Sequence, residues 1–155
     1  MKTLRDPEIR YWQEYLQTKP LDMPINPNIS ASYAGNKDTT DKLLHLYLIG
    51  KKTAGSSLVQ DFISAGDRLP QIGNFWILLD SQDVPRCILR TERVVFNKFN
   101  NVSEEISQAE GEGDLSLDYW RKTHKFFFSP FLEQWGLNNI EDATVVTEFF
   151  KIVYK

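Results

Sequence analysis

The chain has 155 residues, which is the usual size of one domain with its own hydrophobic core. Hydrophobic residues make up 41% and charged residues 25%, a mixture typical of globular proteins. The formal net charge of -3 argues against a broad electrostatic contact with duplex nucleic acid, so any contact with nucleic acid is expected at a localised site.

The cysteine and histidine content limits the possible redox and metal chemistry. Cys87 is the single cysteine, so an intrachain disulfide and a cysteine-based zinc site are both excluded. Two histidines are too few for a typical catalytic zinc site, and no cofactor is expected. The first residues lack the apolar segment of a signal peptide, and no run of 18 apolar residues exists. We therefore expect a cytoplasmic protein with no membrane partner; its oligomeric state is left open.

The N-terminal part predicts two helices separated by a loop. Asp6 and Pro7 suit the start of a first helix, with apolar residues on one face. The segment 19–37 contains three prolines and is interpreted as a loop or arm of the same domain. A second, strongly apolar helix is predicted over 39–49, and Gly50 is placed to end it. Residues 57–65 fit either a short helix or a strand followed by a turn.

The central and C-terminal parts predict strands alternating with helices. A nearly continuous apolar run at 72–80 and an alternating run at 86–96 indicate an antiparallel hairpin. Ser103 and Ser116 are placed to cap two further helices, the second interrupted at Ser129-Pro130. β-branched and aromatic residues at 144–154 predict a last strand. This order favours an α+β fold, with a small barrel or curled sheet and flanking helices, in a single domain spanning 1–155.

Two segments combine residue types that can perform chemistry. Residues 50–57 hold two lysines and three hydroxyls beside glycines, a pattern suited to binding an anion. The alternative, which the spacing alone favours, is a helix C-terminus whose lysines complement the helix dipole. Residues 110–114 hold three carboxylates hinged by two glycines, which can act as acid or base or accept hydrogen bonds from base amino groups. A solvated acidic loop is the alternative for this second segment.

Both segments together resemble the ASCH-domain family. The motif G-K-K-T-A-x-S-S-L runs from Gly50 to Leu58, and A-E-G-E-G-D-x-S-L-x-Y-W-R-x-x-H begins a second motif that continues from Ala109 to Phe127. With the hairpin and the last strand, the resemblance covers most of the chain from about Asp41 onward. It implies a PUA-like β-barrel, antiparallel or mixed, with flanking helices, in which the two motifs face each other across a cleft.

The resemblance also implies a function connected with RNA or with a nucleotide-like small molecule. Some small members of the family are amidohydrolases that remove the acetyl group from acetylated cytidine, and another bacterial member is a ribonuclease. The amidohydrolases carry G-x-K-T-x-T-x-R, of which Gly50, Lys52 and Thr53 match. Their second threonine falls on Gly55 and their arginine on Ser57, which departs from that pattern. The resemblance leaves open which glutamate corresponds to the catalytic one.

Two functional hypotheses rank nearly level: the chain is a binding module for RNA or a nucleoside, or it is a hydrolase. A third, ranked behind them, is a protein-interaction role of the arm 19–37. Lys52 is the expected base of a hydrolase. The candidate catalytic residues are Lys52, Thr53, Glu110 and Glu112. The candidate ligand-binding residues are Tyr47, Lys51, Ser56, Ser57, Arg90, Asp114, Trp120 and Arg121.

Overall fold

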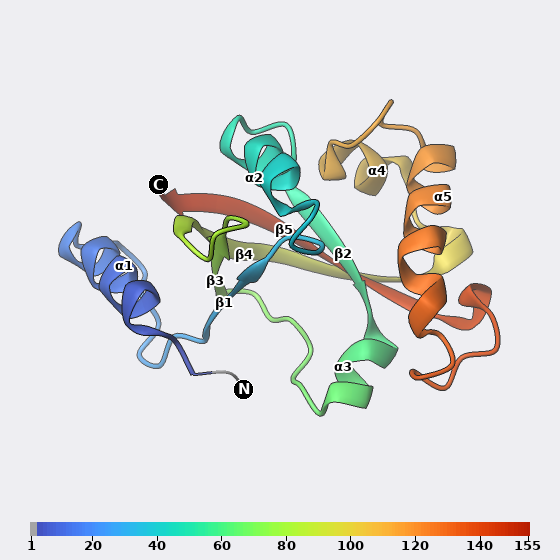
Figure 1. Ribbon diagram of the computed structural model, residues 1–155, viewed down its shortest axis with the longest axis horizontal. Coiled ribbons are helices and arrows are strands. Elements are labelled where there is room, and N and C mark those ends of the chain that lie inside the picture. Colours follow the sequence, from blue (N-terminus) through green and yellow to red (C-terminus); the bar gives the residue numbers. More distant parts are fainter. Residues whose placement is uncertain (1–2) are drawn as a thin grey trace. The chain divides into compact units, whose positions relative to one another are not determined.

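The computed structural model describes residues 3–155, and the chain divides into two compact units. The first contains residues 1–50, 71–92 and 150–155, and the second contains residues 51–70 and 93–149. The strands form one mixed five-stranded sheet in the order β1-β3-β4-β5-β2 (Figure 1). Strands β4 (Pro85–Lys98) and β5 (Thr144–Tyr154) each contribute residues to both units. The predicted α+β class is confirmed.

In the first unit, helices and strands surround two small apolar cores. Helix α1 (Asp6–Gln17) places Trp12 and Tyr15 against Phe75, and α2 (Thr40–Leu48) places Leu44 and Tyr47 in the other core. The first helix begins one residue earlier than predicted: Arg5 is its N-cap, and the Glu8 side chain accepts the Arg5 backbone N–H at 2.9 Å.

The predicted hairpin of the first unit is present, with β3 (Phe75–Leu79) antiparallel to β4. Strand β1 (Ile29–Tyr33) was not expected, because prolines before it suggested an irregular arm, yet it pairs in parallel with β3. On β4, consecutive Cys87, Ile88 and Leu89 are all buried, so the alternation expected of a half-exposed strand fails there. An internal strand of a sheet covered on both faces is apolar on both faces.

The second unit supplies every element needed for the site described below. It contains β2 (Ala54–Leu58), α3 (Val59–Ala65), α4 (Glu104–Glu110), α5 (Leu117–Phe128) and the short helices η1 (Phe99–Asn101), η2 (Ser129–Phe131) and η3 (Ile140–Asp142). Strand β2 is antiparallel to β5, with Ser56 opposite Thr147. Residues 57–65, ambiguous in sequence, are therefore the end of a strand followed by a helix.

One apolar core holds the second unit together. Trp120 and Phe128 from α5 pack with Leu58 from β2 and Ile106 from α4. Ser116 caps α5 as predicted, since its hydroxyl accepts the Tyr119 backbone N–H at 3.0 Å. Ser103 is the N-cap residue of α4, but its side chain makes no capping hydrogen bond, so the prediction of a second serine cap is wrong in that respect. The apolar core packs α4 and α5 with β2 and thereby positions the side chains that they carry.

Candidate functional site

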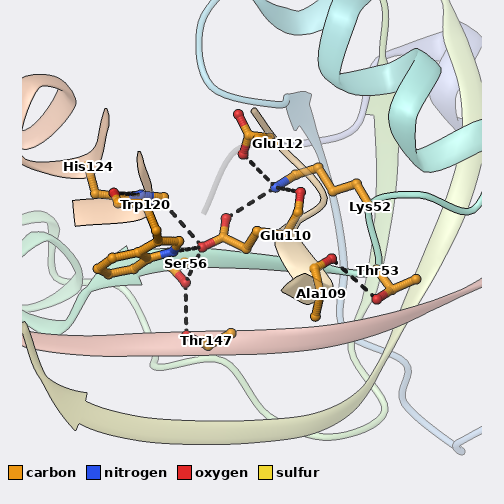
Figure 2. A network of polar contacts seen from close by, with 9 residues as sticks. All are labelled: Lys52, Thr53, Ser56, Ala109, Glu110, Glu112, Trp120, His124 and Thr147. Atoms are coloured by element: carbon orange, nitrogen blue, oxygen red, sulfur yellow. Dashed lines mark hydrogen bonds and ion pairs between the residues drawn. The ribbon is translucent and has the colours of Figure 1, made fainter. Parts of the chain in front are cut away.

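A buried lysine lies at the centre of a polar cluster in the second unit. The Lys52 ammonium is 3.1 Å from Oε1 of Glu110 and 3.0 Å from Oε2 of Glu112, and it also donates to the Glu110 carbonyl at 3.3 Å (Figure 2). The lysine side chain is only 4% exposed. An ammonium group has three protons, and these three acceptors match them. Glu110 and Glu112, which follow Lys52 by 58 and 60 positions in the sequence, therefore both contact its ammonium group.

Glu110 is surrounded by hydrogen-bond donors. Besides Lys52, its carboxylate accepts the Ser56 hydroxyl at 2.8 Å, the indole N–H of Trp120 and the imidazole Nε2 of His124 at 3.3 Å. Burial by itself raises the pKa of Glu110, but the charges of His124 and Lys52 and these hydrogen bonds outweigh it, so the pKa lies well below its ordinary value. Glu110 is therefore an ionised carboxylate inside the protein.

His124 is held as a cation by two acceptors. Its Nδ1 faces the Trp120 backbone carbonyl at 2.8 Å, and its Nε2 faces Glu110. Because a carbonyl and a carboxylate both only accept, each ring nitrogen must carry a proton. Burial lowers the pKa of His124, but the charge of Glu110 and the hydrogen bonds outweigh it, so the pKa lies above its ordinary value. Two buried cations thus balance two carboxylates, those of Glu110 and Glu112.

Glycines and helix-end chemistry explain why the sequence builds this cluster. Helix α4 ends at Glu110, and Gly111 follows with φ +67°, where a Cβ would overlap the Lys51 backbone carbonyl. The last carbonyls of α4 lack partners within the helix. The Thr53 backbone N–H donates to the Ala109 carbonyl at 2.7 Å, and the Lys52 ammonium donates to the Glu110 carbonyl. The lysine segment therefore caps the C-terminal end of the distant helix α4.

The remaining candidates of the second unit have separate surroundings. Thr53 is exposed, and its hydroxyl donates to the Ala109 carbonyl at 3.3 Å, so it does not join the carboxylates. Lys51 is exposed, and Ser57 is half-buried on β2 opposite Val146. Asp114 accepts the Ser116 backbone N–H at 3.0 Å. Arg121 donates to the carbonyls of Asn100 and Val102, at 3.1 and 3.5 Å.

Two candidates, Tyr47 and Arg90, belong to the first unit. The Tyr47 ring packs edge-on against Trp76 and Phe150, with centroid separations of 5.8 and 6.0 Å. The Arg90 guanidinium lies 5.7 Å from the centroid of the Phe75 ring. Tyr47 is thus part of an apolar core, and Arg90 is a half-buried cation over an aromatic ring.

His124 is a member of the cluster that the sequence alone does not indicate, because no nucleophile and orienting carboxylate stand near it in the sequence. Its spacing of four residues from Trp120 did contain a signal, since both side chains then share one face of α5. The two rings stack at 4.1 Å, and both reach Glu110.

A small hollow opens beside the cluster. Its enclosed part is small, about 10 Å³, which is roughly the room of one water molecule, and it opens directly to solvent. Glu112, with its side chain 22% exposed, lines it together with the Tyr119 ring, which is 37% exposed, whereas Trp120 behind them is only 2% exposed. Its lining consists of Ser107, Glu110, Glu112, Ser116, Tyr119, Trp120, Thr123 and His124. Within residues 3–155, no three His, Cys, Asp or Glu side chains are grouped so that they could hold a metal ion.

The ASCH-domain family model matches residues 30–154. The chain belongs to the ASCH-domain family. A crystal structure of an ASCH domain from Lactobacillus crispatus JV V101 is 29% identical, covers 100% of this chain and 99% of that chain, and superposes with a TM-score of 0.90. A protein of Enterococcus faecalis V583 is 32% identical over 96% of this chain and 88% of its own, with a TM-score of 0.81. No curated protein matches the sequence.

The family membership confirms the PUA-like α+β fold that the two motifs implied. Both motifs lie inside the matched range of the ASCH-domain model, and the Lys52–Glu110–Glu112 contact joins them. Across residues 3–155 of this ASCH domain, no helix combines the length and the apolar character that crossing a bilayer requires.

Proposed function

We propose that this ASCH domain binds an unpaired nucleotide of RNA, or a nucleoside, at the open mouth of the hollow beside Glu112. The observation that carries the proposal is the partly exposed Glu112 carboxylate, held in place by a buried lysine near the exposed ring of Tyr119. Amino and imino groups on base edges are donors that a carboxylate accepts, and ring faces of bases stack on aromatic side chains. The serine, threonine and tyrosine hydroxyls around the hollow suit the polar groups of a ribose.

The protonation state of the cluster favours binding over catalysis. Lys52 has an acceptor for each of its protons, and a general base would have to give one of them up. Glu110 is a weak base, because its pKa is lowered, and its carboxylate already accepts four side-chain donors. Both groups therefore suit a rigid support that orients Glu112, which is the role we assign to them.

Calorimetric titration with ribonucleosides and a short single-stranded RNA tests the binding site. Glu112→Gln keeps the size of the side chain but removes the charge, and we expect it to weaken binding by about tenfold or more, as for a lost charge-assisted hydrogen bond. Glu104→Gln, an exposed residue of α4, is the matched control and should bind like the wild type. Unchanged affinity in Glu112→Gln, or no binding by the wild type, would refute the proposal.

A second candidate function, hydrolysis, is favoured by the contact between Ser56 and Glu110. The Ser56 hydroxyl is 2.8 Å from the carboxylate and 2.8 Å from the Thr147 hydroxyl, an arrangement in which a serine can act as nucleophile or position one. The substrates implied by the family resemblance are acylated cytidine-like nucleosides, and for a ribonuclease, RNA itself.

Acetate release from acetylcytidine and fragment formation from RNA distinguish hydrolysis from binding alone. If the protein is a hydrolase, the wild type forms one of these products, and Ser56→Ala and Lys52→Ala lower the rate by about a hundredfold or more. Ser57→Ala, the neighbouring strand residue, serves as the control. A wild type that binds but forms no product excludes hydrolysis of these two substrates.

A further inference from the structure

Helix α5 exposes an aromatic side chain that its own core does not need. Phe126 is 85% exposed, although Phe128, two residues on, is 4% exposed and fully part of the core. Exposing a phenylalanine of this size to water is unfavourable, and several exposed apolar side chains close together often mark a contact surface. Phe127 and Phe131 nearby are also exposed, at 38% and 39%.

The spacing of residues on α5 connects this ring with the hollow. Tyr119 and Thr123 line the hollow, and Phe126 follows Tyr119 by seven residues, or about two turns. Residues separated by four and seven positions lie on the same face of a helix. Phe126 therefore lies about 10 Å further along the face that begins at the hollow. Tyr119 is itself 37% exposed, so two aromatic rings are accessible along this line.

Basic side chains accompany the two rings. Lys122 and Lys125 are exposed on the same helix. Helices α5 and η2 together carry three basic residues and one acidic residue, whereas the rest of the chain has 15 basic (18 less 3) and 20 acidic (21 less 1). The local charge is thus opposite in sign to that of the whole chain.

The existing ion pair on this face does not block a ligand. Lys122 pairs with Asp118 at 3.3 Å, but the two side chains are 79% and 82% exposed. Such a surface pair contributes little to stability and is easily exchanged for another anion. A phosphate group can therefore take the place of Asp118 at Lys122.

From these features we infer that single-stranded RNA extends from the hollow along α5, over a surface we call the α5 strip: Tyr119, Lys122, Lys125 and Phe126. The inference rests on the proposed function, and it adds that the ligand is a strand and not a single nucleoside. Exposed aromatic rings accompanied by lysines are the arrangement that binds unpaired bases by stacking and their phosphates by charge. A protein partner fits less well, because lysines are depleted from protein–protein interfaces.

Fluorescence anisotropy with a labelled single-stranded RNA of about eight nucleotides tests the strip, since this length matches typical single-strand sites. Phe126→Ala should weaken oligonucleotide binding by about fivefold or more, the effect of losing one stacked base. Its control is Leu21→Ala, which removes a similarly exposed apolar side chain, 87% exposed, from the first unit. Both positions are exposed, so neither change should alter folding.

The salt dependence tests the lysines separately. In a K122A/K125A variant, the slope of log affinity against log salt concentration should decrease by about 1.4, because each lost phosphate contact on a single strand accounts for about 0.7. A K42A/K151A variant removes two other exposed lysines and should keep the wild-type slope. Changes confined to the α5 variants would support the strip.

Nucleoside titration keeps the two proposals distinguishable. Phe126→Ala and K122A/K125A should bind a free nucleoside like the wild type, because neither change touches the lining of the hollow. If nucleoside binding persists while oligonucleotide affinity is the same in all variants, the strip inference is wrong and the proposed function stands. In that case Phe126 would instead belong to a protein contact, detectable as self-association that Phe126→Ala abolishes. If neither ligand binds the wild type, both proposals fail.

Discussion

At the residue scale, Lys52 performs two structural tasks at once. It completes the C-terminal end of α4 by donating to the Glu110 carbonyl, and it neutralises the carboxylates of Glu110 and Glu112. A buried ion pair contributes little net stability relative to an apolar core, but removing one partner leaves an uncompensated charge. Removing any one of these charged side chains is therefore expected to lower the free energy of unfolding, and single substitutions can measure that loss.

Replacing Glu110 tests how far the cluster depends on its central carboxylate. Glu110→Gln leaves Lys52 and His124 as buried cations with one fewer carboxylate between them. We expect the free energy of unfolding to fall by about 3–5 kcal/mol, the cost typical of breaking a buried ion pair. Urea denaturation gives this value, and Glu105→Gln, whose side chain is 62% exposed, should change it by less than about 1 kcal/mol. A loss in Glu110→Gln as small as in the control would contradict the assigned role.

The pH dependence of stability follows from the two shifted groups. The pKa of His124 is raised above its ordinary 6.5, so its contribution is fully present below pH 6.5 and is lost as the pH rises through the raised value. The pKa of Glu110 is lowered from 4.5, so its contribution is present above pH 4.5 and is lost as the pH falls through the lowered value. The pair therefore stabilises the fold most strongly between these two ordinary values.

Urea denaturation at about pH 5.5 and about pH 8.5 checks this expectation on its alkaline side. The wild type should lose free energy of unfolding between the two conditions, and His124→Gln should lose less, because it lacks the titrating group. His45→Gln, which removes the other histidine, should behave like the wild type. Equal pH dependence in all three proteins would show that His124 is not held as a cation.

At the element scale, the glycines of the acidic segment matter more than its number of charges. Sequence reasoning treated Gly111 and Gly113 as hinges of a loop, whereas the structure uses both for close packing. A Cβ at Gly111 would overlap the backbone of residues 51–52, and one at Gly113 would meet the Tyr119 ring. The motif G-E-G is thus a device that brings α4, the lysine segment and α5 together around Glu112.

A pair of glycine substitutions separates close approach from backbone conformation. Gly111→Ala and Gly136→Ala both place a side chain at positive φ, +67° and +76°, but only the first meets other atoms. Gly136→Ala should lower the free energy of unfolding by about 1–2 kcal/mol, the cost of a left-handed alanine. Gly111→Ala should lower it further and should also weaken ligand binding, because the Lys51 carbonyl must move. Equal losses in stability would mean that the overlap is relieved without cost.

At the scale of the whole molecule, the sequence predicted local elements better than contacts between side chains that are distant in the sequence. The hairpin, the Ser116 cap and the last strand follow from periodicity and turn residues, which are local properties. Strand β1 was missed because its pairing with β3 is long-range and its flanking prolines resemble a loop. The contact between Lys52 and the two glutamates could be expected only from the family resemblance, since no local pattern relates residues 58 positions apart.

Strands shared by both units lead to a prediction about cooperativity. Residues of β4 and β5 belong to the first unit in one part and to the second in the other, so unfolding either unit breaks pairs along the same two strands. We therefore expect one unfolding transition, as in a small two-state protein.

Trp12 and Trp76 report on the first unit, and Trp120 and Trp135 on the second. A W120F/W135F variant and a W12F/W76F variant allow each unit to be followed by fluorescence alone. For each variant, the fluorescence midpoint in urea should coincide with the midpoint from far-ultraviolet circular dichroism of the same protein, whereas a separation in either variant would show that the units unfold independently.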